Sequence, residues 1–170
     1  MEGDSRLSLV DNATAARVAA LIDALAETGE TVAVAESLTG GLVLSTLVNP
    51  AGASRVVVGG AMVYSTDVKA SVLGVDAGLL AERGAVDAAV AVQMAAKVRT
   101  TFGSTVGLAT TGVAGPDPQD GIAVGTVFVA VASDHGDSVE EHHFEGTRDD
   151  IRWATVDAAL AILENSLRTE

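Results

Sequence analysis

Cysteine is absent from this chain of 170 residues, and proline (three residues) and aromatic side chains (3%) are scarce. The lack of cysteine excludes disulfides, thiolate nucleophiles and metal centres with cysteine ligands. Basic residues are few, because 10 Lys and Arg stand against 23 Asp and Glu and give a formal net charge of −13. Such an acidic chain is a poor candidate for binding DNA or RNA through a broad basic surface, although local cations can still hold a small anion.

Long hydrophobic runs are missing as well. Apolar residues make up 48% of the chain, but charged residues interrupt them before they reach the roughly 18–20 residues of a membrane span. The first five residues, Met-Glu-Gly-Asp-Ser, lack the basic and then apolar order of a signal peptide. We therefore expect a soluble cytoplasmic protein with no membrane partner. The length suits one domain over residues 1–170, with its core at about 13–165.

Apolar periodicity predicts helices that alternate with short buried strands. Helices are expected over about 13–27 and 40–48, after Thr66 as a plausible N-cap, from Asp87, and from near Thr147. Strands are expected at 31–35, 54–65, 105–111, 125–132 and 138–144. Buried strands flanked by helices indicate an α/β fold, a three-layer α/β/α sandwich. The hairpin between the last two strands favours a mixed, mostly parallel central sheet.

Glycine and small hydroxyl residues follow the first predicted strand. There, Ser37, Thr39, Gly40 and Gly41 open a helix. Hydroxyls and backbone N–H groups at such a position suit a phosphate or a developing oxyanion. An ordinary N-cap with a flexible turn is the alternative interpretation.

Two further strand ends carry similar candidates. Tyr64 and Lys69 follow the second strand, and a desolvated lysine can lose its proton and act as a base toward a serine. A solvated helix lysine is the plainer interpretation. Thr111, Gly112 and Gly115 follow a later strand, where the glycines serve either a tight turn or close approach to a ligand.

Two arginines lie four residues apart at the start of the last helix. Arg148 and Arg152 therefore share a face and are candidates for clamping a phosphate. Ion pairing with neighbouring acidic residues such as Asp149 is the alternative. The sequence carries no metal-binding signature.

The ordered set of motifs is more specific than any one of them. The segments AESLTGG, GGAMVYSTDVKASVLGV, TTGVAGPD, VGTVFVAV and FEGTRDDIRWATVDAAL together resemble the CinA C-terminal domain family, from about Ala15 to Leu163. The resemblance implies an α/β/α fold and nicotinamide-nucleotide amidohydrolase activity, of the PncC type. That reaction converts nicotinamide mononucleotide (NMN) and water to nicotinate mononucleotide and ammonia in pyridine-nucleotide salvage, with no cofactor and no metal.

The resemblance also suggests roles for individual residues. The serine of the family's ES-x-TGG motif falls on Ser37, the lysine after its YS motif on Lys69, and the tyrosine of that motif on Tyr64. Thr111 stands where the family has a small hydroxyl residue, and Arg148 matches the arginine of a GDR motif. The sequence departs from that motif, because threonine precedes Arg148 where the family usually has aspartate.

These matches lead to a mechanistic hypothesis. Ser37 attacks the carboxamide carbon, and neutral Lys69 takes the proton of Ser37 and later protonates the leaving ammonia. Backbone N–H groups of either the 39–41 turn or the 112–115 loop bind the oxyanion. Tyr64 and Thr111 orient the reacting groups, and Arg148, together with Arg152, binds the 5′-phosphate.

Two other functions stay open at this point. The first alternative is a non-catalytic nucleotide-binding or regulatory module with the same fold. The second is an amidase that acts on another carboxamide. Ammonia release from NMN separates the enzyme from the module, and the substrates nicotinamide and nicotinamide riboside separate the two amidases. An alanine-rich helix face also leads us to expect a homo-oligomer, most simply a dimer.

Overall fold

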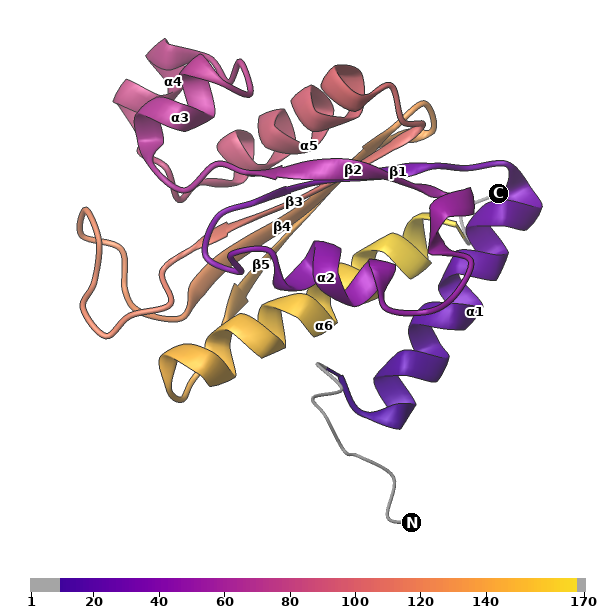
Figure 1. Ribbon diagram of the computed structural model, residues 1–170. Helices are drawn as coiled ribbons and strands as arrows, with labels where there is room; N and C mark the ends of the chain where they lie inside the picture. The colour runs from indigo at the N-terminus through magenta and orange to yellow at the C-terminus, as the bar shows by residue number, and fades with distance from the viewer. Residues whose placement is uncertain (1–9, 168–170) are drawn as a thin grey trace.

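A five-stranded sheet in the order β2-β1-β3-β4-β5 forms the middle layer of the computed structural model, which describes residues 10–167 (Figure 1). The strands are β1 (Val32–Glu36), β2 (Val57–Met62), β3 (Val106–Gly112), β4 (Thr126–Ser133) and β5 (Gly136–His143). β1 pairs in parallel with both β2 and β3, whereas β4 is antiparallel to β3 and to β5. Four of the five strands thus point the same way, which confirms the predicted mixed, mostly parallel sheet.

Helices cover both faces of the sheet, as Figure 1 shows. They are α1 (Asn12–Thr28), α2 (Leu42–Val48), α3 (Thr66–Ser71), α4 (Ala77–Arg83), α5 (Ala88–Phe102) and α6 (Arg148–Ser166). One buried cluster joins α1, α2 and α6 to one face, and a second joins α4 and α5 to the other. The predicted three-layer α/β/α architecture is therefore confirmed.

The two sheet faces differ in side-chain size. Strand residues facing α1, α2 and α6 are mostly Val and Leu, whereas those facing α5 are mostly Ala. Small residues let α5 lie close against the sheet, and Gly107 marks the tightest point. A Cβ atom there would lie only 1.9 Å from the carbonyl oxygen of Ala95 in α5. Close packing of this kind fixes the sheet, and with it the strand ends where ligands bind in α/β proteins.

The sequence predictions differ from the structure at three places. Ser65, rather than Thr66, is the N-cap of α3, and its side chain accepts from the N–H of Val68. Helix α4 was not predicted. The expected strand at 54–65 is shorter, because residues Ala53–Arg55 form a 3₁₀ turn before β2 begins. The predicted start of α6 is confirmed, with a capping box between Thr147 and Asp150.

No helix within residues 10–167 is long and apolar enough to cross a lipid bilayer. The acidic segment Met1–Ser5, which is predicted not to be a signal peptide, lies outside the described residues.

Candidate active site

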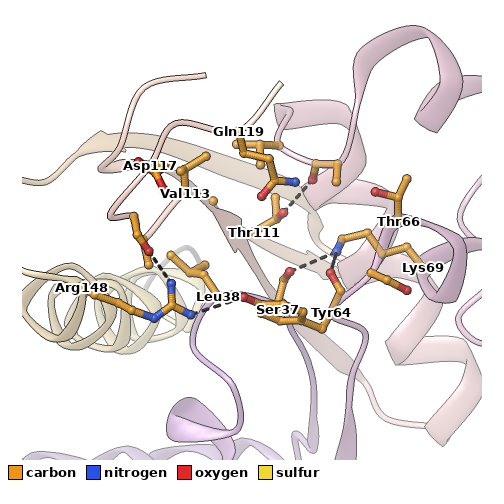
Figure 2. Close-up of a pocket in the computed structure, with 16 residues that line it drawn as sticks. Ser37, Leu38, Tyr64, Thr66, Lys69, Thr111, Val113, Asp117, Gln119 and Arg148 are labelled. Atoms are coloured by element: carbon orange, nitrogen blue, oxygen red, sulfur yellow. Dashed lines mark hydrogen bonds between the residues drawn. The ribbon is translucent and has the colours of Figure 1, made fainter. Parts of the chain in front are cut away.

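A cavity of about 400 Å³ opens at the carboxyl ends of β1 and β3 (Figure 2). Ser37 directly follows β1, and its N–H donates to the carbonyl oxygen of Thr110 in β3 at 3.1 Å, so the two strand ends meet here. The cavity has a volume typical of small-molecule sites. Residues from five parts of the chain line it, among them Ser37, Tyr64, Lys69, Thr111 and Arg148. The structure thus brings together five residues that the sequence placed far apart.

Lys69 is fully buried and points at Ser37 (Figure 2). Its Nζ atom lies 3.0 Å from Ser37 Oγ, and it donates to the carbonyl oxygens of Val63 at 2.8 Å and Tyr64 at 3.1 Å. No carboxylate within residues 10–167 forms an ion pair with Lys69. The amine is therefore held by neutral groups alone.

This environment favours the uncharged amine. Burial lowers the pKa of Lys69 from its ordinary value of 10.5 to about 8. A neutral amine has two N–H groups and one lone pair, and the three neighbours of Nζ match that set. The two carbonyl oxygens accept the N–H groups, which leaves the lone pair for the hydroxyl proton of Ser37. The geometry suits a base and a nucleophile in direct contact.

Thr39, Gly40 and Gly41, which were predicted to bind substrate, do not line the cavity, although Leu38 of the same turn does. The N–H of Gly40 donates to the carbonyl oxygen of Ser37 at 3.1 Å, and the N–H of Gly41 donates to the carboxylate of Glu36 at 3.0 Å. Thr39 is buried, and its hydroxyl shares a 2.8 Å hydrogen bond with that of Thr110. The N–H groups of Gly40 and Gly41 and the Thr39 hydroxyl are thus engaged in hydrogen bonds within the protein.

Gly112, which lines the cavity, is a candidate oxyanion donor. Gly112 faces Val127 across the β3–β4 ladder, and the hydrogen bond from the neighbouring Val113 N–H to the Thr126 carbonyl fixes the alternation. The N–H of Gly112 therefore points away from β4, toward the end of β1 and Ser37. Of the two predicted sources of oxyanion donors, the 112–115 loop lines the cavity, whereas residues 39–41 do not.

Thr111 lies beside this donor at the base of the cavity. Its side chain is buried, and its hydroxyl donates to the carbonyl oxygen of Ala85 at 2.7 Å. This bond commits the hydroxyl proton and leaves the oxygen as an acceptor toward the cavity. It also joins β3 to the segment that follows α4, which forms one wall of the site.

Arg148 and Tyr64 form the outer rim of the cavity (Figure 2). The guanidinium of Arg148 donates to the carbonyl oxygen of Gly115 at 2.7 Å and to the Tyr64 hydroxyl at 3.3 Å. The Tyr64 side chain is otherwise open to solvent, with 58% of the residue exposed. An exposed arginine at the cavity mouth keeps further N–H groups for an anionic ligand.

Arg152 does not join Arg148 at the cavity, so the predicted pair of phosphate-binding arginines is not formed. Its guanidinium instead donates to the carbonyl oxygens of Leu38 and Thr39, both at 3.1 Å, and lies 3.3 Å from Asp149. The alternative prediction, an ion pair between Arg152 and Asp149, is thus confirmed. Backbone carbonyl groups are the other partners of Arg152, and no sequence pattern indicates them.

Sequence reasoning also missed residues that belong to this region. Thr66, Asp117 and Gln119 line the cavity. No group of three or more possible metal ligands is found among the described residues. Glu36 was overlooked because its partners are backbone N–H groups, which no sequence pattern marks. Its carboxylate accepts from the backbone N–H groups of Gly41, Val43 and Leu44 at the start of α2.

The protein is a three-layer α/β domain whose candidate site pairs a buried lysine with a serine at the strand ends. The family model for the CinA C-terminal domain matches residues 14–167, and the chain therefore belongs to this family. It is 47% identical over 143 residues to a CinA-like protein of Frankia casuarinae, a match that covers 84% of this chain and 33% of that protein. A CinA-like protein of Geobacter sulfurreducens is 43% identical over 168 residues, covering 98% of this chain and 40% of the relative.

The chain thus spans about a third of the length of the curated relatives it matches. Solved structures of similar size also match. The competence/damage inducible protein CihA from Agrobacterium tumefaciens has a TM-score of 0.89 and 33% identity, covering 96% of this chain and 100% of that chain. A CinA superfamily protein from Enterobacter cloacae has a TM-score of 0.87 and 30% identity, covering 96% of this chain and 98% of that chain.

Proposed function

We propose that this protein is an amidohydrolase that converts NMN and water to nicotinate mononucleotide and ammonia. One observation carries the proposal: a fully buried lysine amine lies 3.0 Å from a serine hydroxyl at the wall of an open cavity. A carboxamide needs a strong nucleophile and a proton donor for its poor leaving group, and a serine with a neutral lysine supplies both. Membership of the CinA family supports this choice of reaction.

In the first step, Ser37 Oγ attacks the carboxamide carbon while the Lys69 amine takes the hydroxyl proton. The C–O bond forms, and the carbonyl oxygen becomes a tetrahedral oxyanion. We assign the N–H of Gly112 as the donor to that oxyanion, because Gly112 lines the cavity and its N–H faces the Ser37 segment. The lysine becomes an ammonium, which its two carbonyl partners stabilise.

In the second step, the tetrahedral intermediate collapses. The C–N bond breaks, and the Lys69 ammonium gives its proton to the leaving nitrogen, which departs as ammonia and leaves an ester on Ser37. A water molecule then attacks the ester carbon, with the restored Lys69 amine taking its proton. Cleavage of the C–O bond returns that proton to Ser37 and releases nicotinate mononucleotide.

Substrate recognition uses the cavity mouth. The exposed guanidinium of Arg148 binds the 5′-phosphate, with N–H groups beyond those that contact Gly115 and Tyr64. The Tyr64 ring is exposed at the same rim and offers a π-face to the cationic pyridinium ring. Both contacts lie at the mouth, which directs the carboxamide inward toward Ser37.

Product analysis tests the proposal. The purified protein is incubated with NMN, nicotinamide riboside or nicotinamide, and ammonia and the acid product are quantified together. We expect equal amounts of ammonia and nicotinate mononucleotide from NMN, and poor turnover of the two compounds that lack the phosphate. NMN binding without ammonia release would instead indicate a nucleotide-binding module, and a preference for a compound without phosphate would indicate a different amidase.

A further inference from the structure

The turn that carries Ser37 is held on both sides by charged side chains. On one side, the buried carboxylate of Glu36 accepts the backbone N–H groups of Gly41, Val43 and Leu44 at 3.0, 3.1 and 2.8 Å. Helix α2 has no side-chain cap of its own, since Gly41 is its N-cap. The Glu36 carboxylate caps α2 instead, although Glu36 lies before the turn, and these bonds fix where the turn ends.

The carbonyl side of the same turn faces Arg152 from α6. Its Nε atom donates to the Leu38 carbonyl oxygen and its Nη2 atom to the Thr39 carbonyl oxygen, both at 3.1 Å. These are the first two carbonyl groups after Ser37. The ion pair with Asp149 leaves the guanidinium plane aimed at the turn. One planar group thus holds two successive peptide units.

The fit between Arg152 and the turn is close. Gly40 has a φ of +61°, and a Cβ atom at this position would lie 3.3 Å from Arg152 Nη2. A side chain at Gly40 would therefore meet both backbone strain and the guanidinium. The lack of a side chain at Gly40 therefore lets the backbone of the turn lie against the Arg152 guanidinium.

We infer that Arg152 is a positioning residue for the nucleophile and does not bind substrate. It acts through the Leu38 and Thr39 carbonyl groups, which set the direction in which the Ser37 side chain leaves the turn, toward Lys69 and the cavity. Arg152 itself does not line the cavity, whereas Arg148, one helical turn earlier, does. The inference rests on the proposed function in taking Ser37 as the nucleophile.

Steady-state kinetics on NMN and nicotinamide riboside test this assignment in the full chain. Arg152→Gln and Arg152→Lys are compared with Arg17→Lys, a control arginine that donates to Glu164 at 2.7 and 3.0 Å. We expect Arg152→Gln to lower kcat roughly 10- to 100-fold, the scale of a small misplacement of a reacting group, with KM and the preference for NMN unchanged. Arg152→Lys should fall between Gln and the wild type, because an ammonium is a point charge and does not hold both carbonyl groups. Arg17→Lys should match the wild type.

A second readout follows Ser37 without NMN. Phenylmethylsulfonyl fluoride reacts with an activated serine, the Oγ–sulfur bond forming as fluoride leaves, and the labelling rate is measured by mass spectrometry of the intact protein. We expect labelling to fall in parallel with kcat in the Arg152 variants. If the wild type is labelled but does not hydrolyse NMN, the proposed function fails while the positioning role is still tested.

Two results would overturn the inference. A rise in KM with loss of the preference for NMN would make Arg152 a phosphate ligand. Wild-type kcat and labelling in both Arg152 variants would remove the positioning role. Urea unfolding of each variant shows whether the compared proteins are folded, and the charge-conserving Arg152→Lys variant keeps the test available if Arg152→Gln does not fold.

Discussion

Replacing the buried Lys69 by methionine should change how the stability of this protein depends on pH. The pKa of Lys69 is lowered from 10.5 to about 8 by burial, so the folded protein binds fewer protons at this group than the unfolded chain between these pH values. The free energy of unfolding of the wild type therefore rises with pH across this window. Since one pKa unit corresponds to 1.36 kcal/mol, the rise from Lys69 is about 3 kcal/mol.

Lys69→Met removes this pH-dependent contribution. The variant also leaves the carbonyl oxygens of Val63 and Tyr64 without their donor, which costs about 1–3 kcal/mol for each group at every pH. That second cost does not depend on pH, so it lowers the variant's free energy of unfolding by the same amount at every pH. The difference in unfolding free energy between wild type and variant should therefore grow by about 3 kcal/mol between pH 7.5 and pH 10.5.

Urea unfolding followed by circular dichroism measures this difference at several pH values. Lys97→Met is the matched control, because Lys97 is the other lysine of the chain and lies exposed on α5. The free energy of unfolding of Lys97→Met should change with pH in parallel with that of the wild type. Parallel curves for Lys69→Met as well would refute the reasoning, since they would mean that burial does not favour the neutral amine.

Three further predictions follow from the site. First, kcat/KM for NMN should rise about tenfold per pH unit below pH 8 and level off above it, because the proposed base is the neutral form of Lys69. Ammonia release between pH 6 and pH 10 measures this, and a flat profile would contradict it. Second, Thr39→Val leaves the buried Thr110 hydroxyl without its partner and should lower the free energy of unfolding in urea by about 1–3 kcal/mol. The double variant with Thr110→Val should recover most of this loss. An additive loss in the double variant would argue against the pair. Third, Arg148→Gln should raise KM for NMN at least about tenfold and leave nicotinamide riboside unaffected, in the same ammonia assay; equal losses on both compounds would count against phosphate binding.

Much of the site could be predicted because it forms at the ends of buried strands. Ser37 directly follows β1 and Gly112 ends β3, and the carboxyl ends of these two neighbouring parallel strands meet at one sheet edge. The apolar runs of these strands are clear in the sequence. Small hydroxyl residues and glycine at the ends of such runs therefore indicate a candidate ligand site from the sequence alone.

Contacts made through the backbone could not be predicted in the same way. Arg152 binds two carbonyl groups that any residue would offer, and Glu36 caps a helix that begins six positions later. Neither contact depends on the side chain of its partner, so no pattern in the sequence records it. Helix α4 was missed for a related reason, since its seven residues are too few for a clear apolar period.

Turnover of NMN by the wild type, Ser37→Ala and Lys69→Ala tests the central claim most directly. The wild type should release ammonia, Ser37→Ala should lose measurable turnover, and Lys69→Ala should fall by roughly 10²–10⁴-fold. The double variant should be no worse than Ser37→Ala, because the two residues act as one unit. Full turnover by Ser37→Ala would contradict the account, since the hydrolysis would then proceed without the serine that Lys69 contacts.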